Sequence, residues 1–377
     1  MPAKIQHLED VKKIRTIEDI LKHEMNMPLF DISNWNSGEQ YKKQIMENYH
    51  INAEVDIQDY RYSYELNDKL KKMILQKLGF DFSKESVIFP SSTAAICCIC
   101  DYLKKQGLNK VCILEPAYFS IAACLDSFGL SVNREYINLD ENHIPLIPYE
   151  SILQNNYDVL WITSPIFSTG VYYNDIGISL LLELANKGIF VIIDESISSP
   201  NRYIGNTFKN YSNVLSIISP PKYLAINSQK FCVVVCNSLV ENYLFDWIDV
   251  FIGSLPSSSF IAIDHFLSDN YNKCVDIHDE YVKKSIDIIN DLTSLYPNNF
   301  YTGSDSSYVT IQNKKQSYLN KIDYNFFYNF MKATNTSLIP GYINNFSRRW
   351  GFCYRVNLTL NHFDIKFNLG RVFNYFE

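Results

Sequence analysis

The sequence has no long apolar run and no cluster of basic residues. None of its apolar segments approaches the roughly 18 residues that a membrane-spanning helix needs, so we expect no membrane span. The N-terminal stretch MPAKIQHLEDVKKIRTIEDI is charged throughout, which argues against a secretory signal peptide. No block of Lys and Arg alternates with aromatic residues, which argues against nucleic acid as a partner. We therefore expect a cytoplasmic protein that binds neither a membrane nor nucleic acid.

Cysteine is present without the pattern of a disulfide framework or a metal site. The chain has nine cysteines, an odd number, and most of them lie inside apolar segments. This distribution indicates reduced thiols in the core of a cytoplasmic protein. Cys97 and Cys100 have the CxxC spacing, but no second pair and no nearby histidine accompanies them. We therefore expect no metal site.

The length of the chain predicts two lobes. A chain of 377 residues is too large for one simple core, and its net charge of -7 with 20% charged residues is that of an ordinary soluble protein. The pattern changes after Gly253–Pro256, where a long helical stretch, roughly Phe260–Leu295, would link two lobes. We expect a large domain over residues 46–256 and a smaller α+β domain built from residues 1–45 and 257–377.

Within the large domain, apolar strands alternate with amphipathic helices. This alternation predicts an α/β domain with a mostly parallel sheet and helices on both faces. The predicted strands are Ser86–Phe89, Lys110–Leu114, Val159–Thr163, Ile189–Ile193, Val214–Ile218 and an apolar run after Lys230. The predicted helices are residues 5–24, Glu65–Leu78, Ser92–Lys105, Tyr118–Phe128 and Ile176–Lys187, with residues 28–64 otherwise irregular.

Two of these strands end in a carboxylate and a lysine. Asp194 follows the run IFVII, and Lys222 follows the next strand within Ser219-Pro220-Pro221-Lys222. Ligands of such sheets collect beyond the carboxyl ends of the strands. A carboxylate and a lone lysine there suit a cofactor that needs an amine to bond and an acid to keep it protonated. The alternative is that Asp194 caps a turn and Lys222 is a solvated loop lysine.

Three further strand ends carry polar or aromatic groups. Ser91, Ser92 and Thr93 follow a strand and open a helix, where free N–H groups and hydroxyls hold a phosphate. The alternative is a plain serine N-cap. Tyr118 follows the next strand, and a turn containing Thr169-Gly170 follows the one after it.

Taken in chain order, the five strand ends carry a phosphate-binding group, an aromatic ring, a Thr-Gly turn, a carboxylate and a lysine. This order resembles that of the fold type I pyridoxal-phosphate (PLP) enzymes, specifically the class I/II aminotransferase family. The resemblance extends from about Tyr60 to the C-terminus, with degraded individual motifs. It implies a mostly parallel seven-stranded sheet with helices on both faces, plus a smaller α+β domain. It also implies pyridoxal 5'-phosphate as cofactor, a free α-amino acid as substrate, and a homodimer with active sites at its interface.

The resemblance assigns roles to single residues. Lys222 looks like the lysine that forms the Schiff base, Asp194 like the carboxylate that pairs with the pyridinium nitrogen, and Tyr118 like the ring stacked on the pyridine. These three would form the catalytic group. Arg355, in FCYRVNLTL, resembles the arginine that grips the substrate's α-carboxylate. Its alternative is a surface arginine on an edge strand.

The phosphate-binding group is implied in the same way. It would consist of Ser91, Ser92, Thr93 and Ser219, with Lys230 at the place where the family usually has an arginine. One tyrosine of Tyr60, Tyr62 and Tyr64 would reach the partner subunit's phosphate, and we select Tyr62.

At two positions the chain departs from the family. Phe167 stands where the family has the asparagine that bonds the cofactor's O3′, and Ile197 stands where it has a tyrosine. Neither side chain donates a hydrogen bond. Ser164, Ser168 or Ser196 would have to substitute, and the spacing does not choose among them.

The sequence therefore leaves three functions open. The favoured one is amino transfer with Lys222 moving the proton. The second is a lyase, cyclase or decarboxylase of the same fold in secondary metabolism, similar to capreomycidine synthase. The third is a catalytically inactive relative kept as a binding protein. Substrate specificity is expected from the loops Ser33–Gln40 and Pro340–Trp350.

Overall fold

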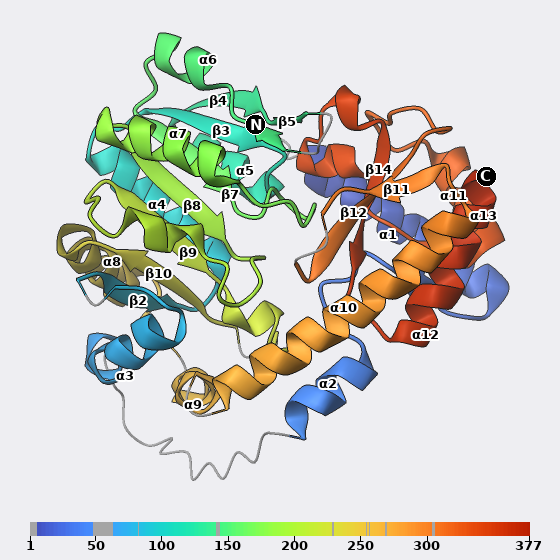
Figure 1. The fold of residues 1–377 in the computed structure, drawn as a ribbon, viewed down its shortest axis with the longest axis horizontal. Helices are drawn as coiled ribbons and strands as arrows, with labels where there is room; N and C mark the ends of the chain where they lie inside the picture. Colours follow the sequence, from blue (N-terminus) through green and yellow to red (C-terminus); the bar gives the residue numbers. More distant parts are fainter. Residues whose placement is uncertain are drawn as a thin grey trace.

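The computed structural model describes residues 6–47, 63–81, 83–140, 144–227, 230–253, 255, 257–267, 270–303 and 306–377. Figure 1 shows a larger lobe built on one wide sheet and a smaller lobe that contains both the N-terminal helix and the C-terminal third of the chain. The domain limits at residues 45 and 256 stay a prediction.

The large lobe is organised by a seven-stranded sheet in the order β2-β10-β9-β8-β7-β3-β4. Strand β10 is antiparallel to both of its neighbours, and the other pairs are parallel. The strands are β2 (Glu85–Phe89), β3 (Lys110–Glu115), β4 (Ser131–Tyr136), β7 (Val159–Thr163), β8 (Phe190–Glu195), β9 (Val214–Ile218) and β10 (Cys232–Cys236).

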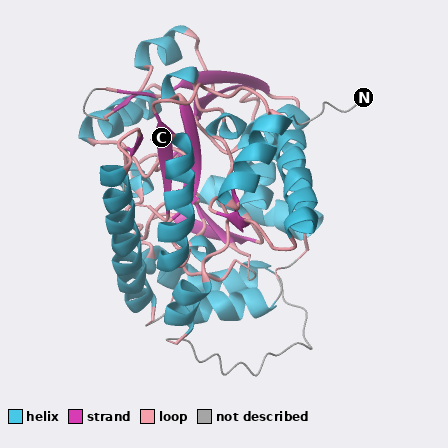
Figure 2. Cartoon of the chain, turned by 90° about the vertical axis from the view of Figure 1, so that its right-hand side faces the viewer, coloured by secondary structure: helices cyan, strands magenta, loops and turns pink. Residues whose placement is uncertain are grey.

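The central strands are apolar on both faces because helices cover both sides of the sheet, as the turned view in Figure 2 shows. The helices of this lobe are α3 (Ser63–Lys77), α4 (Ser92–Lys105), α5 (Phe119–Ser127), α6 (Tyr149–Gln154), α7 (Asp175–Asn186) and α8 (Ser238–Phe251). A two-stranded ribbon, β5 (Asn138–Leu139) with β6 (Pro145–Leu146), lies beside them. The predicted α/β class with a seven-stranded, mostly parallel sheet is confirmed.

The small lobe packs helices on a three-stranded antiparallel sheet. The order is β11 (Asn299–Tyr301), β12 (Tyr308–Asn313) and β14 (Phe352–Asn357). Its helices are α10 (Tyr271–Leu295), α11 (Tyr324–Thr334), α12 (His362–Asp364) and α13 (Gly370–Phe376), with α1 (Gln6–Met25) packed in the same core. A short parallel pair, β1 (Phe30–Asp31) with β13 (Thr336–Ser337), ties the N-terminal segment to this lobe.

The structure differs from the predicted element map in several details. The stretch Phe260–Leu295 is two helices, α9 (Ser257–Phe266) and α10, and Asn270 is the N-cap residue of α10. Residues 28–64 include β1 and the helix α2 (Glu39–Met46), whose polar sequence EQYKKQIM buries only Tyr41 and Ile45. Strand β4 was not predicted, because it lies at the sheet edge and its residues are exposed or half-buried.

Turns of the large lobe touch the sheet of the small lobe. Thr310 on β12 donates its hydroxyl to the Ser168 carbonyl at 2.8 Å, and Ser306 donates to the Ile197 carbonyl at 3.1 Å. A Cβ atom added to Gly303 would lie 2.3 Å from the carbonyl carbon of Gly170. The two lobes therefore meet backbone to backbone beside the loops that follow β7 and β8.

No helix in the described part of the chain combines the length and the apolar character that crossing a membrane requires.

Candidate active site

A cavity of about 610 Å³ opens at the edge of the large sheet where the parallel strands end. Strand β10 runs the opposite way, so its beginning meets the same edge as the ends of its neighbours. Eight of the residues predicted for the site line this cavity. They are Ser91, Ser92, Thr93, Tyr118, Asp194, Ser219, Lys222 and Lys230.

Asp194 and Lys222 reach the cavity from the adjacent strands β8 and β9. Asp194 is buried and its Oδ1 accepts the Ser196 amide at 3.0 Å. Pro220 and Pro221 fix their φ angles and begin the short 3-10 turn that ends at Lys222. Both side chains therefore lie inside one cavity, and Lys222 is not a solvated loop lysine.

The environment of Lys222 favours its neutral amine. Burial, together with the charge of Arg355, lowers the pKa of Lys222 to about 8, while Asp194 acts in the opposite direction. A neutral amine is the form that attacks a carbonyl group. The structure thus places an amine of reduced basicity beside a carboxylate in a largely apolar pocket.

Helix α4 presents its N-terminus to the cavity. Ser91 is the N-cap, and its Oγ accepts the Ala94 amide at 3.1 Å, so the predicted N-cap is present as well. The amides of Ser92 and Thr93 come before this bond and have no carbonyl of their own helix to pair with. Together with the helix dipole, they form a site suited to an anion. Lys230 is exposed at the rim, just before β10.

One wall of the cavity is aromatic and apolar. Tyr118, Phe167, Ile197 and Trp35 pack together with the buried Tyr308. The Tyr118 and Phe167 rings stack with centroids 6.0 Å apart, and Trp35 meets Tyr118 edge-on at 6.3 Å. Phe167 and Ile197 line the cavity, so the two departures from the family pattern lie at its surface and offer no hydrogen-bond donor there.

The three serines proposed as substitute donors differ in position. Ser196 lines the cavity, and its hydroxyl donates to Ser92 Oγ at 3.2 Å. The Ser164 and Ser168 hydroxyls are buried outside the cavity lining and have no partner among the described residues. Ser196 is therefore the one of the three that can face a ligand.

Arg355 is near the cavity but does not line it. It is 4% exposed on β14, so it is not a surface arginine. Its Nη2 donates to the Ser33 carbonyl, and the Ser33 hydroxyl donates to the Arg355 carbonyl at 2.6 Å. Its guanidinium carbon lies 3.6 Å from the centroid of the Trp35 ring. Burial lowers the pKa of Arg355.

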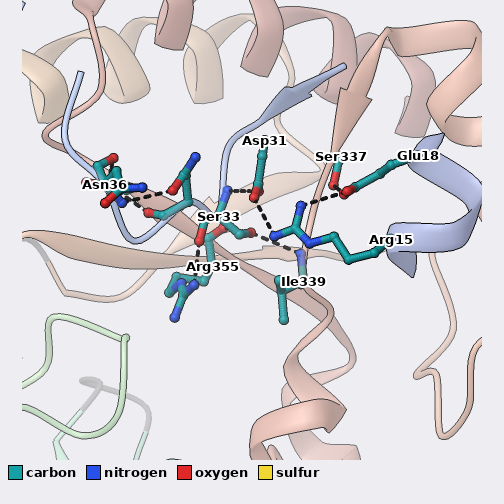
Figure 3. A network of polar contacts seen from close by, with 10 residues as sticks. Arg15, Glu18, Asp31, Ser33, Asn36, Ser337, Ile339 and Arg355 are labelled. Atoms are coloured by element: carbon teal, nitrogen blue, oxygen red, sulfur yellow. Dashed lines mark hydrogen bonds and ion pairs between the residues drawn. The ribbon is translucent and has the colours of Figure 1, made fainter. Parts of the chain in front are cut away.

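A polar network holds the segment that contacts Arg355 (Figure 3). The Ser33 amide donates to Asp31 Oδ1 at 2.9 Å, and Arg15 of α1 pairs with the other oxygen of Asp31 at 3.0 Å. The Ile339 amide donates to Ser33 Oγ at 3.0 Å. Helix α1 and the segment after β13 thus fix Ser33, which in turn fixes the arginine.

Several cavity residues were not predicted. They are Trp35, Asn36, Thr163 and Asn227, among others. Trp35 and Asn36 lie in an irregular segment far in sequence from the sheet, and Asn227 Nδ2 donates to the Trp35 carbonyl at 2.9 Å. The loop Ser33–Gln40, expected to set specificity, does reach the cavity through these two residues. Tyr62 lies outside the described residues, so its predicted role stays a prediction.

The CxxC motif does not form a pair. Cys97 Sγ lies 3.6 Å from Cys124 Sγ on helix α5, whereas Cys100 is buried in the core. In the described ranges, no group of three His, Cys, Asp or Glu residues is placed to hold a metal ion.

Comparison with curated proteins finds a distant relative for part of the chain. No family model matches the chain. Over 216 residues the chain is 24% identical to the histidinol-phosphate aminotransferase of Buchnera aphidicola subsp. Schlechtendalia chinensis. The match covers 54% of this chain and 60% of that protein, which is less than two thirds of the relative.

Solved structures show the fold more completely. An aspartate aminotransferase double mutant of Thermus thermophilus superposes with a TM-score of 0.77 at 12% identity, covering 99% of this chain and 97% of that one. A PLP-bound C-S lyase of Staphylococcus hominis superposes with a TM-score of 0.73 at 14% identity, covering 93% and 89%. The chain has the fold that these aminotransferases and lyases share, which confirms the fold expected from the sequence.

Proposed function

We propose that this chain is a pyridoxal-phosphate-dependent enzyme that transfers the amino group of a free α-amino acid. The observation that carries the proposal is the placement of Asp194 and Lys222 in one cavity, at the ends of the adjacent strands β8 and β9. The distant relative and the superposed structures support it, since they include aminotransferases.

The residues of the cavity fit the cofactor. Pyridoxal phosphate, when bound, would supply an aldehyde carbon that a lysine amine can attack and a ring that can accept the electrons of a bond broken at the substrate's Cα. Lys222 is the enclosed amine, Asp194 supplies the charge for the ring nitrogen, and Tyr118 supplies a ring to stack on. The first turn of α4 provides the amides of Ser92 and Thr93, which have no carbonyl partner within their own helix, and Lys230 at the rim of the same cavity adds a positive charge for the phosphate.

Lys222 is also suited to move a proton. With a pKa of about 8, roughly a tenth of its amine is neutral at pH 7. Its Nζ could therefore take the proton from the substrate's Cα and deliver it to the cofactor's C4′, on the other side of the amino nitrogen. A general base with a pKa near the working pH is the efficient choice for this transfer.

Arg355 is the proposed partner of the substrate's α-carboxylate. Its Nε is buried and has no acceptor among the described residues, whereas Nη2 is already bonded to Ser33. A planar guanidinium pairs with a carboxylate through two parallel hydrogen bonds, which fixes the direction of the Cα–H bond.

A second activity is favoured by a specific feature of the same cavity. Phe167 and Ile197 remove two hydrogen-bond donors from the wall, and the superposed structures include a C-S lyase. We therefore keep elimination, cyclisation or decarboxylation of an amino acid, similar to capreomycidine synthase, as the alternative. A catalytically inactive binding protein is the third reading.

One experiment separates these readings. The purified holoenzyme is mixed with a panel of amino acids, while absorbance, keto acid and ammonia are followed. Accumulation of the pyridoxamine form with keto acid supports transfer, and ammonia or a cyclised product without it supports the alternative. No spectral change with any amino acid supports the inactive reading. Lys222→Ala is the control that removes the reactive amine.

The homodimer and the cytoplasmic location belong to the same proposal. They rest on the family resemblance and on the reduced cysteines, and the molar mass in solution tests the first of them. A monomer would leave the site without the tyrosine expected from a partner subunit.

A further inference from the structure

Trp35 occupies the space between the cavity and Arg355. Its indole lines the cavity, and its ring centroid lies 3.6 Å from the Arg355 guanidinium carbon and 5.0 Å from Lys222 Nζ. Arg355 itself is buried and does not line the cavity. A ligand in the cavity therefore meets the indole before it meets the guanidinium.

The backbone around Trp35 is held on both sides. Asn357 Nδ2 donates to the carbonyls of Asn34 and Asn36 at 2.8 and 3.1 Å, and Asn227 Nδ2 donates to the Trp35 carbonyl. Because these bonds fix the main chain, the indole can change place only by rotation about its side-chain torsions. Trp35 is half-buried and lines the cavity, so part of the indole surface faces the cavity space.

The buried guanidinium has an unused donor. Nη2 is bonded to Ser33, but the Nε–H group finds no acceptor in the part of the chain that the structure describes. A buried donor without an acceptor is unfavourable, and a carboxylate that reached it would remove this cost. The arginine is thus prepared for an anion while the indole covers it.

We propose that Trp35 is a specificity-determining cover of Arg355, which turns aside when a substrate carboxylate binds. The inference rests on the proposed function and adds a residue to it. When the indole rotates away, its stacking on the Arg355 guanidinium is lost, which costs free energy. A small carboxylate that contacts only Arg355 gains too little binding free energy to offset this loss. An amino acid gains binding free energy from two contacts, one at Arg355 and one at Lys222. The cover therefore selects ligands that carry an amine and a carboxylate together.

A different role makes the opposite prediction. If the indole were a fixed platform, it would hold the guanidinium plane in place while a carboxylate bound at the guanidinium edge. Removing the ring would then weaken carboxylate binding. If the indole is a cover, removing the ring should instead strengthen carboxylate binding.

The test uses two stable adducts that differ only in the carboxylate, N-(5′-phosphopyridoxyl)-L-alanine and N-(5′-phosphopyridoxyl)ethylamine. Their affinities for the full-length protein freed of cofactor are measured by calorimetry. The ratio of the two dissociation constants reports the contribution of the carboxylate. We expect Trp35→Ala to raise the preference for the alanine adduct by roughly threefold or more, and Trp35→Phe to raise it less. Arg355→Gln should bring the two affinities close together.

A second readout follows the indole directly. The protein has four tryptophans, so labelling with 5-fluorotryptophan gives few fluorine NMR signals, and Trp35→Phe identifies the signal of Trp35. We expect this signal to shift with the alanine adduct and to stay near its free position with the ethylamine adduct. This measurement keeps an indole at position 35, so it holds even if Trp35→Ala does not fold.

The outcomes are distinct. An unchanged or reduced preference in Trp35→Ala, or an equal shift of the Trp35 signal with both adducts, overturns the cover. Failure of both adducts to bind the wild-type protein contradicts the proposed function instead. An unchanged preference in Arg355→Gln removes Arg355 as the carboxylate site and the cover with it.

Discussion

The hydroxyl of Ser196 donates to Ser92 Oγ at 3.2 Å and joins the end of β8 to the first turn of α4. Ser196 also donates its amide to Asp194. The carboxylate proposed for the ring nitrogen and the helix turn proposed for the phosphate are therefore connected through one side chain. Ser196 thus ties together the two ends of the proposed cofactor site.

The reactive amine is tested by chemical labelling. Borohydride treatment of the yellow holoenzyme should fix a phosphopyridoxyl group on Lys222, because its amine is enclosed and has a lowered pKa. Lys222→Ala should lose turnover and keep only non-covalent cofactor. The matched control is Lys230→Ala, in which peptide mapping should still find the label on Lys222. A label on any other lysine contradicts the assignment.

The carboxylate is tested by Asp194→Asn, which keeps the shape and removes the charge. We expect a rate loss on the order of a thousandfold, because the ring nitrogen would no longer be held protonated. Steady-state kinetics with a responsive amino acid measure it. Asp175→Asn, at the exposed start of α7, is the control and should keep normal turnover. Near-normal turnover of Asp194→Asn would make this carboxylate structural.

The arginine is tested by Arg355→Lys. A point charge replaces the planar fork, so KM for the amino acid should rise about tenfold or more while cofactor affinity stays the same. Arg371→Lys, on the exposed side of α13, should change neither quantity. Equal turnover of an amine that lacks a carboxylate would refute the role of Arg355.

The two positions at which the chain differs from the family pattern, Phe167 and Ile197, predict how the colour of the enzyme depends on pH. With Phe167 and Ile197 on the wall, the O3′ of a bound cofactor would receive fewer hydrogen bonds, and its less stabilised phenolate would be protonated up to higher pH. The yellow form of the substrate-free enzyme should persist through neutral pH and bleach in alkaline buffer. Phe167→Asn and Ile197→Tyr should each move the transition to lower pH. Loss of the yellow band before neutrality in the wild type would show that Ser196 or another donor compensates.

A buried glutamate next to the site predicts how stability depends on pH. Burial raises the pKa of Glu195 from 4.5 to about 8, although it accepts the amides of Ile204 and Gly205. The folded chain therefore binds more protons than the unfolded chain between these values, so the free energy of unfolding falls as pH rises across this range. Glu195 should contribute roughly 1 kcal/mol per pH unit to this slope, and Glu195→Gln should remove that contribution, as measured by denaturant titration. Glu183→Gln, on an exposed face of α7, should leave it unchanged.

The features predicted best from the sequence are those that depend on apolar runs and on the residues that follow them directly. Asp194 and Lys222 follow short continuous apolar runs, and parallel strands bring their ends to a common edge, so the position of both residues near the N-terminus of α4 could be predicted. Strand β4 could not, since an edge strand is not buried on both faces and lacks an apolar run. Its position is set by pairing with β3.

The cavity's other wall depends on contacts between distant segments. Trp35 reaches the site because Asn227, Asn357 and Ser33 fix its loop, and no local pattern encodes those bonds. The burial of Arg355 was equally hidden, since alternating flanks allow a strand residue to face either side. Residues supplied by irregular loops are therefore the part that sequence patterns alone do not predict.

The contact between Gly303 and Gly170 limits how the protein can diversify. With two backbones at this separation, a side chain at position 303 would push the small lobe away from the turn after β7. The close spacing of the lobes at this point thus requires that residue 303 has no side chain. This requirement does not depend on which residues line the cavity. Substitutions at Phe167 or Ile197 can therefore change the chemistry of the cavity wall while the spacing of the two lobes stays the same. Cavity specificity and lobe spacing thus depend on different residues.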